Sequence, residues 1–192
     1  MTGTTMTGPT IRNGVNVEDL LGAIAAVTED GANGRLRFRV GTKWLGGFRA
    51  RHTPGAFSVG GQEGTHAADY SVVSDEPAEV LGTDDGISPA ELMLSALGAC
   101  LTVGYAANAA ALGIEIEDLA MEISTDASLE GFMNIRDAEP AVESVTVQVH
   151  VQTSAPAEAV QELHDYVNAH SPIWRTLAGP VRLASSVSVS GS

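Results

Sequence analysis

The feature that most constrains the fold is an uncharged stretch near the middle of the chain. Residues 92–114 carry no acidic or basic side chain, and the segment Ser88-Pro89-Ala90-Glu91 precedes them. This segment is a capping box with proline at the first helical position. Since no helix breaker follows before Gly113, we expect a helix of about 25 residues, roughly 37 Å long.

A helix of this length and hydrophobicity could also cross a membrane. Its composition argues against that, because Ala and Gly dominate, Asn108 lies inside it, and neither end carries basic and aromatic flanking residues. A helix that is apolar on every side must then be buried in protein on every side. We therefore predict no membrane association, and expect sheets wrapped around the helix with help from a second subunit.

The rest of the chain is predicted to be α+β. Residues 1–14 are expected to form a flexible tail, residues 15–31 an added N-terminal helix capped by Asn16, and residues 32–192 the main domain. Strands are expected within 35–40, 43–52, 67–73, 116–132, 143–154 and 181–189, and further helices at 156–170 and 171–177. Because strands and helices come in segregated runs, a largely antiparallel sheet is favoured over an alternating parallel fold.

Charge and cysteine content exclude several classes of protein. The net charge is −14, from 24 acidic and 10 basic residues, which argues against nucleic acid as a partner. A single cysteine cannot form an internal disulfide, and the first residues lack the basic and apolar regions of a signal peptide. A cytoplasmic location is the resulting expectation.

That single cysteine, Cys100, falls near the middle of the predicted helix. It is therefore far from the helix N-terminus, where the dipole would favour a thiolate. A free buried cysteine most often acts as a small hydrophobic residue. The residue pattern alone thus leaves open whether Cys100 is structural or reactive.

Residues 88–101, SPAELMLSALGACL, resemble the central helix of the OsmC/Ohr superfamily, in which a proline, a glutamate and a cysteine occur at the same spacing. The likeness extends to KWLGGFRARH (43–52), DEPAEVLGTDDG (75–86), ALGIEIEDLAMEI (111–123) and HSPIWRTL (170–177). It implies an OsmC-like α+β fold, in which antiparallel sheets wrap long central helices in an intertwined homodimer.

The resemblance also implies a chemistry. Many members reduce organic hydroperoxides with a cysteine that matches Cys100, and a second cysteine then resolves the product as a disulfide. Here Ser171 occupies the resolving position, so an external thiol must act as reductant. The glutamate that follows the proline in studied members is Ala90 here, and Glu91 lies one residue later, about 100° further round the helix. The partner arginine of that glutamate matches Arg49 or Arg51.

Two histidines are candidates for activating Cys100. In GQEGTH (61–66), Glu63 could orient His66 in a Cys–His–Glu arrangement, although a solvated loop fits the same pattern. His170 precedes Ser171, and could equally interact with the last carbonyls of its helix. The remaining histidines, His52, His150 and His164, belong to no motif. No zinc-site spacing is present, so we predict neither metal nor cofactor.

Three functions fit these observations. The favoured one is a thiol-dependent detoxification enzyme that reduces organic hydroperoxides at Cys100, followed by reduction by an external thiol. The second is a cysteine-dependent hydrolase or acyl transferase in which His66 or His170 is the base. The third is a non-catalytic protein that binds a small lipophilic molecule, in which Cys100 would be dispensable.

Overall fold

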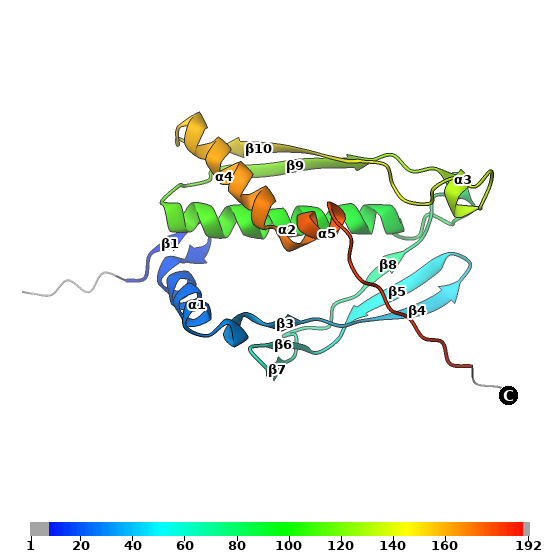
Figure 1. Cartoon of the computed structure of the whole chain (residues 1–192), viewed down its shortest axis with the longest axis horizontal. Helices are drawn as coiled ribbons and strands as arrows, with labels where there is room; N and C mark the ends of the chain where they lie inside the picture. The colour runs from blue at the N-terminus through cyan, green and yellow to red at the C-terminus, as the bar shows by residue number, and fades with distance from the viewer. Residues whose placement is uncertain (1–7, 190–192) are drawn as a thin grey trace, which may run out of the picture.

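The computed structural model describes residues 8–189 as a mixed α+β fold built around one long helix, α2 (Figure 1). The helices and strands in chain order are β1 (Ile11–Arg12), β2 (Val15–Asn16), α1 (Val17–Glu29), the 3₁₀ turn η1 (Gly31–Gly34), β3 (Leu36–Arg37), β4 (Val40–Gly46), β5 (Arg49–Pro54), β6 (Phe57–Val59), β7 (Gln62–Gly64), β8 (Val72–Ser74), the 3₁₀ turn η2 (Ala78–Val80), α2 (Pro89–Leu112), β9 (Asp118–Thr125), α3 (Leu129–Phe132), β10 (Val145–Gln152), α4 (Ala157–His170) and α5 (Pro172–Leu177). Within residues 8–189 the strands form four antiparallel sheets, which confirms the predicted α+β class.

Helix α2 begins and ends where the sequence predicts. The Ser88 hydroxyl accepts a hydrogen bond from the Glu91 backbone N–H at 3.2 Å, and Glu91 Oε2 accepts one from the Ser88 N–H at 2.8 Å. At the other end Gly113 adopts the left-handed conformation with φ 80°, which glycine tolerates without steric cost. The capping box and the terminal glycine thus fix both ends of the helix.

The core lies between α2, the β9–β10 hairpin and α4, which form the upper layer in Figure 1. Strands β9 and β10 pair along their full length, and their alternating apolar residues face α2. The fully buried core side chains come from two helices: Leu97, Leu101, Tyr105 and Ala109 from α2, and Leu163 and Val167 from α4. This core positions the α4–α5 junction against the middle of α2.

Strands β3 to β8 form a second, lower layer (Figure 1). The β4–β5 hairpin turns at Gly46 and Gly47, both with positive φ, and β8 pairs with the outer edge of β5. Several large apolar side chains of this layer are exposed: Leu36, Phe38, Val40, Trp44 and Phe48. The lower layer therefore carries apolar surface that this chain alone does not cover.

The expectation that α2 is buried on every side is wrong for a single chain. Only 17% of its most apolar 18-residue window is buried, and Val103 is 69% exposed. By length and composition alone α2 is the one helix in residues 8–189 that could cross a membrane. Its other face nevertheless packs on α4 and β9–β10, as a helix does in a globular fold.

Several expected strands differ from the structure. The strand expected at 35–40 is divided between β3 and β4, the one at 43–52 turns back at Gly46–Gly47 as β4 and β5, and the one expected to reach residue 132 ends at Thr125, before α3. The strand expected at 67–73 is confined to β8, residues 72–74. The strand expected at 181–189 has no ladder partner within residues 8–189, although its apolar residues alternate and are exposed, as in Val181, Leu183 and Val187. A strand needs a neighbouring edge to pair with, and this segment runs out from α5 without reaching one (Figure 1).

The N-terminal region is held on α2. Arg12 donates a hydrogen bond to the Ala110 carbonyl, and the Asn13 side chain bonds to the backbone of Ile114 and Ile116. Asn16 caps α1 as predicted, since its side chain accepts from the Asp19 N–H at 3.2 Å. Residues 1–7 of the expected flexible tail lie outside the described residues.

Candidate functional site

The single thiol of the chain, on Cys100, is hydrogen-bonded to the hydroxyl group of Ser171. Cys100, half-buried on α2, accepts a hydrogen bond from the Ser171 hydroxyl, with 3.1 Å between Oγ and Sγ. Ser171 is 5% exposed and is the N-cap of α5, where its Oγ also accepts from the Trp174 backbone N–H at 3.2 Å. The Ser171 oxygen thus accepts one hydrogen bond from the backbone, while its hydroxyl proton is donated to the sulfur.

A glycine allows α4 to come close enough for this contact. A Cβ on Gly104 would lie 2.8 Å from Cγ1 of Val167, closer than two carbon atoms can approach without displacement. Val167 is one turn before Ser171 on the same side of α4, and its backbone carbonyl accepts from the Ser171 N–H at 2.9 Å. The close crossing of α2 and α4 therefore places Ser171 on Cys100.

His170 lies next to Ser171 in sequence but is engaged elsewhere. Its Nδ1 donates to the Tyr166 carbonyl at 2.8 Å, and its ring stacks on that of Tyr166 with centroids 4.0 Å apart. Among the hydrogen bonds of residues 8–189, none joins His170 to Cys100. The predicted alternative, a histidine that contacts the last turn of its own helix, matches these contacts.

Arg49 pairs with a carboxylate that sequence reasoning missed. Its guanidinium lies 2.9 Å from Asp85 Oδ2, in the loop that leads into α2. That loop is organised by Asp75, which is 1% exposed and whose Oδ2 accepts from the Thr83 hydroxyl and from the backbone N–H groups of Thr83 and Asp85. The Thr83 hydroxyl, with these N–H groups, lowers the pKa of Asp75 to about 2 against the opposing effect of burial.

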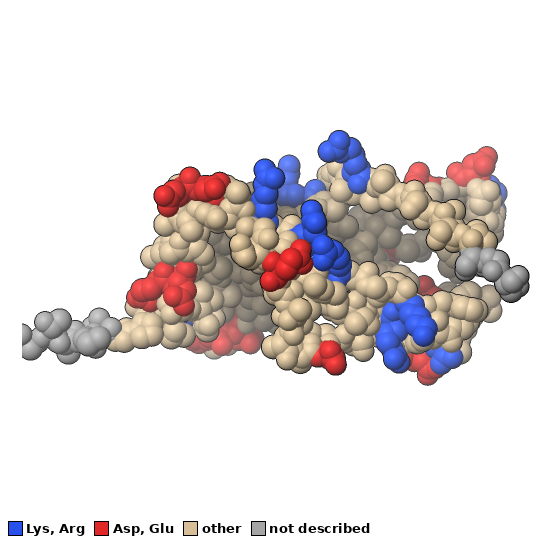
Figure 2. Space-filling model, turned by 90° about the horizontal axis from the view of Figure 1, so that it is seen from below, with Lys and Arg blue, Asp and Glu red and all other residues tan. Residues whose placement is uncertain are grey.

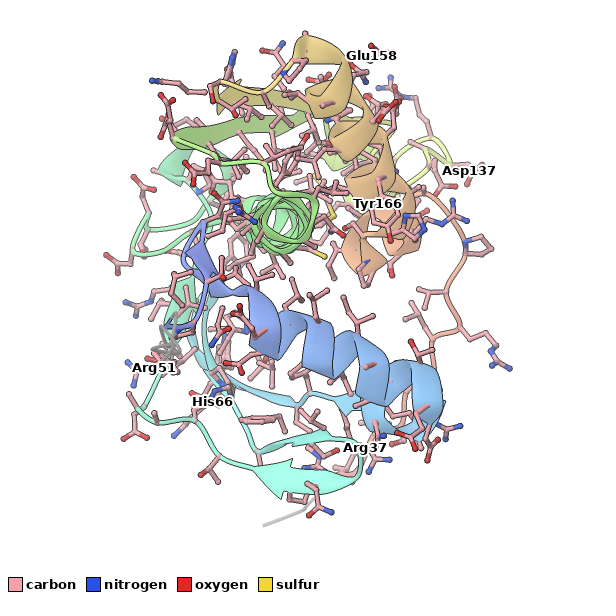
Figure 3. All side chains as sticks on the ribbon, turned by 90° about the vertical axis from the view of Figure 1, so that its left-hand side faces the viewer. Arg37, Arg51, His66, Asp137, Glu158 and Tyr166 are labelled. Atoms are coloured by element: carbon pink, nitrogen blue, oxygen red, sulfur yellow. The ribbon has the colours of Figure 1, made fainter. Side chains whose placement is uncertain are left out.

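The Glu63–His66 pair does not form in this chain. Glu63 on β7 lies 3.5 Å from the Arg39 guanidinium, whereas His66 packs between the rings of Phe57 and Tyr70. Figure 3 shows His66 in the lower layer, apart from α2. The structure thus leaves Glu63 and His66 without a contact to Cys100 of their own chain, in the part of the chain that it describes.

Glu91 serves the helix start rather than the thiol. Its carboxylate accepts from the Ser88 N–H, and this hydrogen bond lowers the pKa of Glu91. An ionised carboxylate in the first turn also interacts favourably with the helix dipole. In residues 8–189 the ion pair of Arg49 is with Asp85 and not with Glu91.

Two histidines without a sequence motif have defined partners. His52 bonds to Thr42 through Nδ1 and to Ser74 through Nε2. His164 bonds to the hydroxyl of Tyr105, which lies 59 residues away in sequence. These partners come from separate elements, so no local spacing could reveal them. In residues 8–189 no group of three or more His, Cys, Asp or Glu side chains is placed to hold a metal ion.

The sequence around this site matches a known protein family. The family model described as OsmC-like protein matches residues 82–186, which is more than half of the chain and includes both Cys100 and Ser171. No curated protein matches the sequence.

Solved structures share the fold at low sequence identity. An OsmC-like protein from Mycoplasma pneumoniae is 19% identical with a TM-score of 0.56, over 74% of this chain and 88% of that one. A putative osmotic stress induced and detoxification response protein from Psychrobacter arcticus is 12% identical with a TM-score of 0.55, over 71% and 85%. An organic hydroperoxide resistance protein from Legionella pneumophila is 16% identical with a TM-score of 0.50, over 74% and 90%. At these identities the likeness shows the fold alone.

Proposed function

Because the chain belongs to the OsmC-like protein family, we propose that it is a one-cysteine peroxidase that reduces organic hydroperoxides at Cys100. The observation that carries the proposal is the 3.1 Å hydrogen bond from the Ser171 hydroxyl to the Cys100 sulfur. A hydroxyl at this distance is placed to donate to a thiolate, which is the nucleophilic form of cysteine. The similar Legionella pneumophila protein is named for organic hydroperoxide resistance, which supports the same class of substrate here.

The reaction has three balanced steps. The Cys100 thiolate attacks the terminal oxygen of a hydroperoxide, so an S–O bond forms, the O–O bond breaks, and the alkoxide leaves and is protonated to the alcohol. Cys100 is then a sulfenic acid. An external thiol displaces hydroxide as water and forms a mixed disulfide, and a second thiol molecule releases Cys100 as the thiol, with a disulfide of the reductant as product.

Ser171 sets the need for that external thiol. A hydroxyl cannot form a disulfide, so nothing at the resolving position can capture the sulfenic acid within the chain. The proposal accordingly places the protein in the cytoplasm, where glutathione and thioredoxin systems keep small thiols and dithiols reduced.

The proposed working form is a homodimer. The exposed side of α2, with Val103, and the exposed apolar side chains of the lower layer, such as Phe38 and Trp44, are surfaces that a second copy would cover. Arg49 and His66 lie on that lower layer and make no hydrogen bond to Cys100 of their own chain. We propose that any action of these two residues on Cys100 occurs across the subunit interface.

The hydrolase alternative lacks a comparable observation. Neither candidate base, His66 or His170, bonds to the thiol in the described chain, whereas nucleophilic catalysis at carbon needs a base within hydrogen-bond reach. The same experiment separates the alternatives, because an acyl enzyme and a sulfenic acid differ in mass.

The test is intact-mass spectrometry of the reduced protein after one equivalent of cumene hydroperoxide, in the presence of dimedone. We expect one dimedone adduct, located at Cys100 by peptide mapping, and cumyl alcohol in equal amount. Steady consumption of hydroperoxide should then require an added dithiol.

Two controls complete the test. Cys100→Ser should form no adduct and should leave the hydroperoxide unconsumed. Activated esters and thioesters, tested in parallel, should leave no acyl group on Cys100. A wild-type thiol that stays unmodified by the hydroperoxide would overturn the proposal, and an acyl adduct on Cys100 would support the hydrolase in its place.

A further inference from the structure

A second polar cluster lies on α2 beyond the cysteine. The Tyr105 side chain is 1% exposed, and its hydroxyl lies 2.5 Å from His164 Nδ1. The other nitrogen of this imidazole, Nε2, lies 2.9 Å from Nδ2 of Asn168, one turn further along α4. Tyr105 follows Cys100 by five residues, which places it about 7.5 Å along the helix and about 140° round it. The cluster is therefore separate from the Cys100–Ser171 pair.

A cavity of about 500 Å³ opens beside this cluster. Valines from β10 and α4 form much of its wall, namely Val149, Val151 and Val160, and Ala157 lies at the start of α4. Tyr105 and His164 supply polar groups at the wall. A cleft of this size, in which apolar walls stand beside placed polar groups, is a usual form of a small-molecule site.

The direction of the hydrogen bonds leaves one donor free. We assign the Asn168 amide as donor to Nε2 of His164, because its nitrogen is the atom placed 2.9 Å away; a neutral imidazole then carries its proton on Nδ1 and donates it to the Tyr105 oxygen. The hydroxyl proton of Tyr105 then makes none of the hydrogen bonds that join Tyr105, His164 and Asn168.

Two other polar side chains of the wall donate to groups of the chain itself. The Thr153 hydroxyl donates to the Glu115 carbonyl at 2.5 Å, and the Gln161 amide donates to Asp165 at 2.9 Å. A buried donor without an acceptor costs free energy that a bound acceptor restores. The Tyr105 hydroxyl is thus a buried donor available to a molecule in the cavity.

Charge limits which molecules fit. Helix α4 carries Glu158, Glu162 and Asp165 and no lysine or arginine, and Figure 3 shows Glu158 near its outer end. Burial, with the negative charge of Asp165 as a second cause, raises the pKa of Tyr105 to about 12. The hydroxyl is therefore protonated at neutral pH, and the negative field around it disfavours carboxylates and phosphates.

We propose that this cavity is a binding site for a small, uncharged, apolar molecule that carries a carbonyl group, held by a hydrogen bond from the Tyr105 hydroxyl. The valine side chains contact its hydrocarbon part. The site is distinct from the peroxide chemistry at Cys100 and does not depend on it.

The test is a titration of the full chain, labelled at the valine methyl groups, with 2-octanone and separately with octanoate, followed by NMR. We expect saturable shifts of the Val149, Val151 and Val160 methyl signals with the ketone, and at least tenfold weaker binding of the carboxylate. Tyr105→Phe keeps the ring but removes the donor, so it should weaken ketone binding by about tenfold.

Two further variants keep the test decisive. Tyr166→Phe removes an exposed hydroxyl of α4 that is outside the cavity, and it should bind 2-octanone as the wild type does. Ala157→Trp fills the cavity from an exposed position, so it should abolish the shifts without unfolding the chain. If Tyr105→Phe fails to fold, its methyl spectrum shows this and Ala157→Trp decides. Absence of saturable shifts, equal binding of octanoate, or unchanged affinity in a folded Tyr105→Phe or in Ala157→Trp would overturn the proposal.

Discussion

Ser171 is the single side chain whose proton reaches the sulfur of Cys100 in the described chain. Replacing it with alanine removes the donor and leaves the α5 start without its cap. Since a hydrogen bond to a charged group is worth about 1.5–3 kcal/mol, Ser171→Ala should slow sulfenic acid formation at Cys100 by about tenfold or more. Stopped-flow peroxide consumption measures this rate. Ser171→Thr, which keeps a hydroxyl, is the matched control and should retain most of it.

The same position tests why the protein needs an outside reductant. With Oγ of Ser171 3.1 Å from Sγ of Cys100, a cysteine at 171 would hold its sulfur within reach of the sulfenic acid. In Ser171→Cys one equivalent of hydroperoxide should therefore produce an internal disulfide, seen as a loss of two mass units after workup. Continued trapping of sulfenic acid by dimedone in this variant would contradict the assigned geometry.

At the scale of elements, the crossing of α2 and α4 depends on the absence of a side chain at Gly104. Gly104→Ala adds a methyl group 2.8 Å from Val167 Cγ1, and overpacking of this kind typically costs about 1–3 kcal/mol. We expect a lower free energy of unfolding in urea and slower oxidation of Cys100. Gly22→Ala on α1 has nothing within 4 Å of the new Cβ, so it should instead gain about 0.5–1 kcal/mol from helix propensity. Equal stability changes in the two variants would refute this account of the crossing.

The loop of residues 75–86, which leads into α2, should make stability depend on acid pH. The pKa of Asp75 is lowered to about 2 in the folded protein, whereas an unfolded aspartate titrates near 3.9. The stabilisation is therefore complete above about pH 4 and is lost as the pH falls through about 2. Asp75→Asn should lower the free energy of unfolding at pH 7 and reduce its decline between pH 4 and 2. Urea titrations across this range test it, with Asp118→Asn on β9 as control.

Local patterns determine which elements the sequence predicts well. The capping box at Ser88, the glycine at 113 and the valine alternation of β10 are read from neighbouring residues, and the structure confirms α2 and β10. A strand forms a ladder only where the edge of another strand lies beside it. The alternating residues at 181–189 have no such neighbour in the described chain, so they form no strand there. Pairs such as Arg49–Asp85 and Tyr105–His164 join residues 36 and 59 positions apart. Only the folded chain brings them together.

At the scale of the whole molecule, exposed apolar surface is the basis of the proposed homodimer. Figure 2 shows the molecule from below, hollowed toward the end where the C-terminal segment runs. Val103, 69% exposed on α2, is on the helix face that the proposed second copy covers. Burying a carboxylate there without a partner is costly, so Val103→Asp should yield a monomer in light scattering where the wild type yields a dimer. His150→Asp on the outer side of β10 should stay dimeric, and a monomeric wild type would contradict the proposal.

The exposed apolar side of α2 has a consequence for the stability of the protein. In the proposed homodimer, a chain that buries its long apolar helix on one side only would complete its core by association, and folding and dimer formation would be a single equilibrium. We then expect the midpoint of thermal unfolding to rise with protein concentration, because mass action stabilises the associated form. At low abundance in a cell, the same protein would be less stable, with more of it open to proteolysis.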